Sequence, residues 1–102
     1  MQEKIMRKLF LGFIQVHILH HAQEEPFYGS WMIDELKNHG YDMSPGTLYP
    51  ILHNMEEEGI LKVEKQNVGG KIRKYYSITS YGVEVFADMK HRIRELVNEV
   101  KL

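Results

Sequence analysis

The chain has 102 residues, a hydrophobic content of 43% and a formal net charge of −1 at pH 7. A chain of this length forms one domain around one modest core, so we treat residues 1–102 as a single domain. The absence of cysteine excludes disulfides, thiolate metal sites and a cysteine nucleophile. The small total charge argues mildly against nucleic-acid binding, but the distribution of the charges matters more than their sum.

Residues 1–22 are predicted to form a first helix. Its basic start and apolar run imitate a signal peptide, but Gln15 and His17 interrupt the run and no small-residue cleavage site follows. The run is also too short to span a bilayer, so we predict no membrane association. Ile5, Leu9 and Phe13 form one apolar stripe, and a second stripe lies beside it. We therefore expect this helix to contact its own domain on one side and a second subunit on the other.

Residues 28–59 are predicted to form a helix-turn-helix. The first of the two helices covers residues 28–39 with Gly40 as its cap, and the second begins after Ser44, whose side chain is expected to cap the Thr47 N–H. Apolar residues of the second helix recur at i, i+3, i+4 and i+7 and predict its core face. They are Leu48, Ile51, Leu52 and Met55. The opposite, mostly polar face is the candidate DNA-contacting surface, and it consists of Ser44, Gly46, Thr47, Tyr49, Pro50, His53 and Asn54.

Residues 60–78 are predicted to form a β-hairpin. Two extended runs rich in β-branched and aromatic residues flank Gly69-Gly70, which is typical of a tight hairpin turn. The hairpin carries five cationic residues against Glu64, a net charge of +4. The cationic residues are Lys62, Lys65, Lys71, Arg73 and Lys74. A helix with a polar outer face followed by a basic hairpin predicts a winged helix-turn-helix, in which the helix enters the major groove of double-stranded DNA and the wing follows the phosphates.

Within the wing, we predict phosphate contacts for at least two of the three residues Lys71, Arg73 and Lys74. Tyr75 and Tyr76 point to opposite faces of the strand, so one packs inward and the other faces the DNA. The pattern leaves the assignment open, and Tyr75 is retained as the DNA-facing candidate. The alternative interpretation is that the charged residues only keep an exposed hairpin soluble.

Residues 79–102 are predicted to form a dimerisation helix that begins after Thr79, a candidate N-cap. Apolar residues recur at alternating intervals of three and four residues, the spacing of a heptad seam. The seam consists of Phe86, Met89, Ile93, Leu96 and Val100. Together with Ile5, Leu9 and Phe13 it predicts a homodimer whose recognition helices lie about one DNA turn, roughly 34 Å, apart on a palindromic site. The fold class is thus mainly α with a small β-hairpin: a winged helix-turn-helix with N- and C-terminal dimerisation helices.

Two motifs at the centre of the chain resemble the PadR family of bacterial transcriptional regulators. They are GTLYP, which ends at Pro50, and GG-x-x-RKYY, which begins at Gly69. The resemblance extends upstream to Tyr28-Gly29 and downstream to Gly82, whereas Trp31 departs from the residues more common at its position. A single helix beyond the wing is similar to the short class of the family.

The resemblance implies a cytoplasmic, homodimeric repressor that requires no cofactor. In this family repression is commonly relieved by a small molecule, which in short members implies a pocket for flat aromatic or drug-like effectors between the two dimerisation helices. The candidate lining residues are Phe13, Phe86, Met89 and Ile93, since methionine and aromatic rings adapt to varied apolar ligands. The alternative is that these residues simply close a dry interface.

Two other functions are consistent with parts of the sequence. One is a protein-docking winged helix that never binds DNA, which would lack the steep salt dependence of phosphate contacts. Another is a metal or drug sensor, because His17 and His21 have the i, i+4 spacing of metal ligands, with His20 and Glu24 nearby. With no cysteine and no second cluster to support it, we predict no metal site. Since the sequence has no nucleophile motif and no phosphate-cradling loop, we also predict that the protein is not an enzyme.

Overall fold

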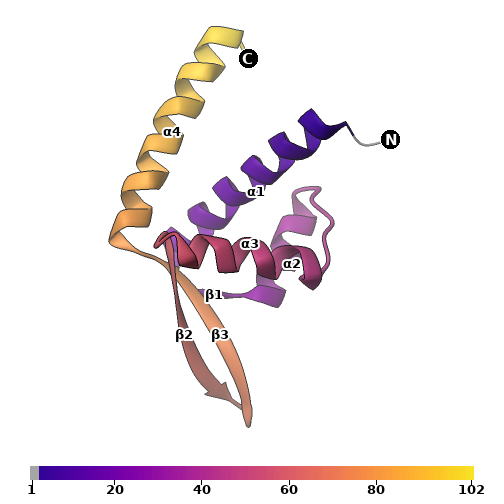
Figure 1. The fold of residues 1–102 in the computed structure, drawn as a ribbon, viewed down its shortest axis with the longest axis vertical. Coiled ribbons are helices and arrows are strands. Elements are labelled where there is room, and N and C mark those ends of the chain that lie inside the picture. Colours follow the sequence, from indigo (N-terminus) through magenta and orange to yellow (C-terminus); the bar gives the residue numbers. More distant parts are fainter. Residues whose placement is uncertain (1–2) are drawn as a thin grey trace.

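The computed structural model describes residues 3–102, which form four helices and a three-stranded antiparallel sheet (Figure 1). The elements in chain order are α1 (Lys4–Glu24), β1 (Phe27–Tyr28), α2 (Gly29–Asn38), α3 (Pro45–Glu57), β2 (Leu61–Val68), β3 (Lys71–Ile78) and α4 (Ser80–Val100). This is the mainly α architecture with a β-hairpin that the sequence predicts. Residues 1 and 2 of the predicted first segment lie outside the described residues.

The turn between α2 and α3 is closed by backbone hydrogen bonds. Gly40 follows α2 with a φ of 91°, and the Tyr41 N–H donates to the Leu36 carbonyl at 2.9 Å, which ends the helix as predicted. The start of α3 differs from the prediction, because the Ser44 side chain makes no cap. The Thr47 N–H donates instead to the Ser44 carbonyl at 3.0 Å, and the two hydroxyl oxygens lie 3.4 Å apart. Since the backbone already satisfies this N–H, both hydroxyls stay at the surface.

The sheet has the strand order β1-β3-β2. The hairpin turn Gly69-Gly70 joins β2 to β3 with positive φ at both residues, 58° and 84°, a combination that favours glycine strongly. The predicted hairpin is confirmed, but β1 was not predicted. Phe27 pairs with Tyr76 and Tyr28 with Tyr75. A strand of two residues is too short to show alternation, so the sequence around it contains no strand signal.

The apolar face of α3 packs in the core, as predicted. Leu48 and Leu52 are fully buried, Met55 is buried and Ile51 is half-buried against the same cluster. Burying a side chain of this kind contributes about 1.5–3 kcal/mol. Together these residues fix the rotation of α3 about its axis, so its opposite face must lie at the surface.

The start of α4 also packs on the core, which corrects the predicted dimer seam. Phe86 is 4% exposed and belongs to the core of its own chain. The reason lies one turn earlier, at Gly82, where a Cβ would overlap the Ile60 carbonyl oxygen. This close approach holds the first turns of α4 against the domain, and the rest of the helix projects away from it (Figure 1). Exposed seam residues therefore begin beyond Phe86.

Candidate nucleic-acid interface

The outer face of α3 is solvent-exposed along its whole length. All seven residues predicted there are exposed, namely Ser44, Gly46, Thr47, Tyr49, Pro50, His53 and Asn54. At Gly46 a Cβ would meet nothing closer than the Ser44 hydroxyl at 3.7 Å, so the helix start is open to an approaching molecule. The His53 ring lies 3.5 Å from a Glu57 carboxylate oxygen and 4.0 Å from one of Glu56. These acidic side chains mark the end of the face at the C-terminal turn of α3.

Tyr49 connects α3 to the start of α2. Its ring is partly exposed, but its hydroxyl end packs over Gly29 so closely that a Cβ on Gly29 would overlap it. Tyr49 was predicted only as a DNA contact, and the structure adds a packing role. The sequence could have indicated this role through the glycine that opens α2, because a residue without a side chain often marks a close approach.

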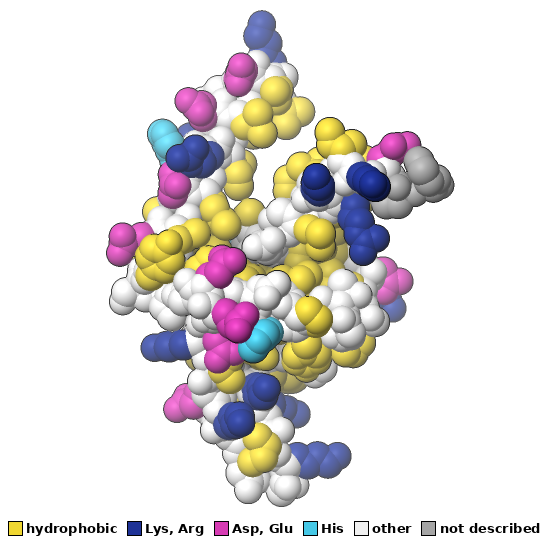
Figure 2. Space-filling view, in the orientation of Figure 1, with side chains coloured by type: hydrophobic (Ala, Val, Ile, Leu, Met, Phe, Trp, Pro, Cys, Tyr) yellow, Lys and Arg dark blue, Asp and Glu magenta, His cyan; other side chains and the backbone are white. Residues whose placement is uncertain are grey.

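The wing collects positive charge at one end of the molecule. Figure 2 shows the Lys and Arg side chains around the hairpin, below the body of the domain. Arg73 is held in place, since its guanidinium carbon lies 4.1 Å from the centre of the Tyr28 ring. Lys71 and Lys74 are exposed. The wing therefore presents three cations on β3, one of which is oriented by an aromatic ring.

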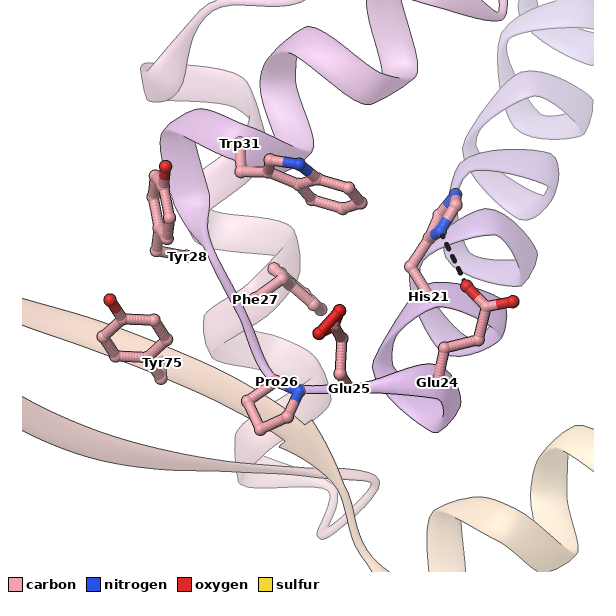
Figure 3. A pocket seen from close by; sticks show the side chains of 8 residues that line it. All are labelled: His21, Glu24, Glu25, Pro26, Phe27, Tyr28, Trp31 and Tyr75. Carbon is pink, nitrogen blue, oxygen red and sulfur yellow. Dashed lines mark ion pairs between the residues drawn. The ribbon is translucent and has the colours of Figure 1, made fainter.

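The structure resolves the direction of the two wing tyrosines. Tyr76 is 4% exposed and stacks on Phe27, with ring centres 5.6 Å apart, and burial raises the pKa of its hydroxyl. Tyr75 is half-buried and faces Tyr28 edge-on at 5.8 Å, as Figure 3 shows. Tyr75 is thus the residue on the Arg73 side of the sheet, and Tyr76 belongs to the core.

A groove of about 400 Å³ joins the wing to the helix-turn-helix. Its walls include Lys71, Arg73 and Lys74 of β3 and Tyr49 of α3. The other predicted residues of α3 lie outside the groove, on the adjoining exposed face. Tyr28 and Ser30 also line the groove, at the start of α2, and were not predicted from the sequence to do so. Their inclusion depends on the pairing of β1 with β3, for which the sequence shows no local signal.

Helices α1 and α4 carry apolar side chains with no cover in the single chain. Ile5 is 75% exposed on α1 and Leu96 is 55% exposed on α4. The remaining exposed members of the predicted dimer surface are Leu9, Phe13, Ile93 and Val100. Met89 is half-buried against the core. Both helices project from the same side of the domain, away from the wing (Figure 1). Within residues 3–102, no helix is long and apolar enough to cross a membrane.

Comparison with known families decides the class of this protein. Residues 18–97 match the transcriptional regulator PadR-like family. The chain belongs to this family. The matched segment contains α2, α3, the complete hairpin and most of α4, so it covers the interface described above. As a PadR-like protein, the chain is a transcriptional regulator and not an enzyme, as predicted, and regulators of this family bind DNA.

Similar proteins agree with this assignment. The chain is 40% identical to the transcriptional regulator Rv3488 of Mycobacterium tuberculosis over 95 residues, which are 93% of this chain and 89% of that protein. The crystal structure of a PadR-like transcription factor from Bacteroides fragilis superposes with a TM-score of 0.84 at 27% identity and covers 97% of both chains. A PadR family regulator from Eggerthella lenta has a TM-score of 0.79 and 32% identity over 94% of this chain and 81% of that one. The winged-helix fold class predicted from the sequence is confirmed.

Proposed function

We propose that this PadR-like regulator is a homodimeric repressor, acting in the cytoplasm, that binds a palindromic site with the exposed face of α3 and the β2–β3 wing. The observation that carries the proposal is the groove in which Lys71, Arg73 and Lys74 meet Tyr49 of α3. Here a helix face with hydrogen-bonding groups adjoins a strand of cations. This combination suits a duplex, which offers base edges in its major groove and phosphates along the rim.

The exposed face of α3 is proposed to enter the major groove. Asn54 has an amide that can donate and accept, which suits the N6 and N7 edge of adenine, and His53 lies beside it. At the start of the helix, Ser44 and Thr47 offer hydroxyls. The missing side chain of Gly46 lets a phosphate approach the backbone at the start of the helix.

The wing is proposed to hold the phosphates beside that groove. A guanidinium packed over an aromatic ring has less freedom to lose on binding than a free arginine, so Tyr28 prepares Arg73 for contact. Lys71 and Lys74 add charge on the same strand, and Tyr75 offers a hydroxyl beside them. These contacts carry little sequence information, but they fix the register of α3 on the duplex.

The exposed stripe on α1 and α4 is proposed to be the dimer interface. Apolar side chains gathered on two projecting helices need cover from water, and a second copy brings the same residues by two-fold symmetry. The seam on α4 is then Met89, Ile93, Leu96 and Val100, without Phe86. It packs together with Ile5, Leu9 and Phe13 of α1.

A small planar aromatic effector is proposed to bind between the dimerisation helices and to release the protein from DNA. Phe13 and Ile93 are exposed in the single chain, and Met89 lies at the edge of the core, so all three can line a pocket completed by the second subunit. Phe86 lies in the core of its own chain, behind these three residues, and supports their packing. A ligand at this place would change the angle between the two subunits and thereby the spacing of the two α3 helices.

The test is binding to the DNA upstream of the protein's own gene, measured by fluorescence anisotropy in the presence of excess competitor DNA. We expect two chains per site, preference over the competitor, and reduced transcription from that promoter in a purified transcription assay. Equal affinity for the competitor, or a complex with one chain, would contradict the proposal. In that case the winged helix would be a protein-docking module.

A further inference from the structure

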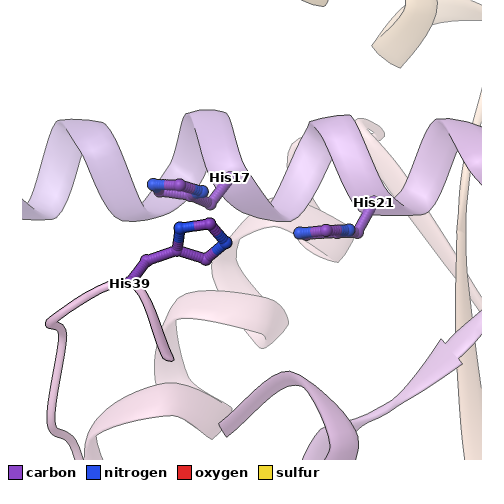
Figure 4. A group of neighbouring side chains, drawn as sticks. All are labelled: His17, His21 and His39. Carbon is purple, nitrogen blue, oxygen red and sulfur yellow. The ribbon is translucent and has the colours of Figure 1, made fainter. Parts of the chain in front are cut away.

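Three histidines from two helices converge on one point. His17 and His21 lie one turn apart on α1, and His39 follows the last turn of α2. Each offers one imidazole nitrogen, and these nitrogens all lie within 4.8 Å of one another (Figure 4). The sequence showed the first pair, but His39 is 18 positions beyond His21 and joins the cluster only because α2 packs beside α1.

A carboxylate lies beside two of the three histidines. The Oε2 atom of Glu35 lies 3.3 Å from His21 Nε2 and 3.1 Å from His39 Nε2. Glu35 and His39 are four residues apart, as are His17 and His21, so each helix contributes one i, i+4 pair. Pairs of potential ligands from two packed helices enclose a point more completely than any single helix can.

His21 is the least satisfied member of the cluster. Its side chain is 13% exposed, and its Nε2 atom is buried without a hydrogen-bond partner, because the Glu35 oxygen at 3.3 Å is not aligned for a hydrogen bond. Buried polar atoms without partners are rare in native proteins, and a bound ion is one arrangement that satisfies them. The other nitrogen, Nδ1, lies 3.6 Å from Glu24 (Figure 3). A carboxylate on the far side of an imidazole is the usual partner of a metal-bound histidine.

We propose that His17, His21, His39 and Glu35 form a four-ligand site for a divalent transition-metal ion of the zinc class, which links α1 to α2. Three imidazoles and one carboxylate suit zinc, cobalt or nickel, whereas magnesium and calcium prefer more oxygen ligands. Tetrahedral bonds of 2.0–2.1 Å place ligand atoms about 3.4 Å apart. The three imidazole nitrogens lie within 4.8 Å of one another, so side-chain rotation is needed to bring them to this spacing.

A second group, His20, His21 and Glu24, competes for the same histidine. It comes from one helix alone, and both His20 and Glu24 are more than half exposed. A site there would leave the buried Nε2 atom of His21 unused. The group that spans two helices uses that atom, and we assign the ion to it.

The test uses the full chain after treatment with a chelator. Zn²⁺ binding is measured by calorimetry, and Co²⁺ is added to report geometry through its visible absorption. We expect one ion per chain and the strong absorption of tetrahedral Co²⁺. His17→Gln and His39→Gln each remove a proposed ligand. Even the loss of a residue that only orients a ligand lowers metal affinity about 10–100-fold, so each variant should weaken Zn²⁺ binding by at least about tenfold.

Two matched variants serve as controls. His91→Gln removes an exposed histidine from α4, and His20→Gln removes the exposed neighbour of His21. Both should bind Zn²⁺ like the native chain, and circular dichroism without metal should show that all four variants are folded. The proposal is overturned if the native chain binds no Zn²⁺. It is equally overturned if His39→Gln binds like the native chain, or if His20→Gln alone abolishes binding.

Discussion

Removing two cations from the wing should flatten the salt dependence of DNA binding. Lys71 and Arg73 line the groove beside Tyr49, and we assign one phosphate contact to each of them, which makes four contacts in a dimer. Each neutralised phosphate contributes about 0.9 to the slope of log K against log salt, so Lys71→Gln, Arg73→Gln should lose about 3.6 of that slope. Between about 50 and 200 mM salt, the native protein should therefore lose on the order of a hundredfold more affinity than the variant.

The assay is fluorescence anisotropy with a labelled operator duplex across a salt series. The control, Arg94→Gln, Lys101→Gln, removes the same charge from α4 and from the residue that follows it, and α4 projects away from the wing (Figure 1). Arg94 directly follows Ile93 of the apolar seam and lies outside the seam, and Lys101 lies beyond the end of the helix. The control should give a line parallel to that of the native protein. If the wing variant is also parallel, the wing does not contact phosphates and the assignment is wrong.

Three further predictions test the fold, the dimer and the metal site. Gly82→Ala should destabilise the chain by about 1–3 kcal/mol in urea unfolding, because the new methyl overlaps the rigid Ile60 carbonyl. A methyl group at Gly46 meets open space, so Gly46→Ala should keep full stability while it weakens DNA binding. Equal loss of stability in the two variants would contradict this prediction. Leu96→Asp should yield monomers in sedimentation experiments, because the dimer loses about 1.5–3 kcal/mol of apolar burial for each of two leucines. The control Asn98→Asp, on the opposite side of α4, should remain dimeric. Zn²⁺ at a hundred times its dissociation constant should stabilise the native chain by about 2.7 kcal/mol, and an unchanged melting temperature would contradict the metal site.

Features that depend on neighbouring residues could be predicted from the sequence. The core stripe that begins at Leu48 is a matter of helical spacing, and the Gly69-Gly70 turn is a matter of allowed backbone angles. Thr79 was predicted as an N-cap, and its hydroxyl accepts from the Gly82 N–H at 2.9 Å. In each case the signal and the structure it specifies lie within one helix or one hairpin.

Features that depend on distant pairing could not be predicted. β1 exists because Phe27 and Tyr28 meet Tyr76 and Tyr75, nearly 50 positions later. Phe86 has the spacing of a dimer seam, yet its burial is decided by how closely α4 approaches Ile60. The seam prediction was wrong at this residue because periodicity identifies an apolar face without identifying what covers it.

The contacts of Thr79 determine how dimerisation can act on DNA binding. Its hydroxyl lies 2.5 Å from the Gly59 carbonyl, to which it donates, and its N–H donates to the Ile60 carbonyl at 3.1 Å. These two carbonyls follow directly after α3, and Thr79 directly precedes α4. The end of α3 is thus fastened to the start of α4, and Gly82 packs against the Ile60 carbonyl. In the proposed dimer, a change in the angle between the two α4 helices would move the two α3 helices through this junction. The proposed effector would thus alter operator affinity without touching the proposed DNA contacts.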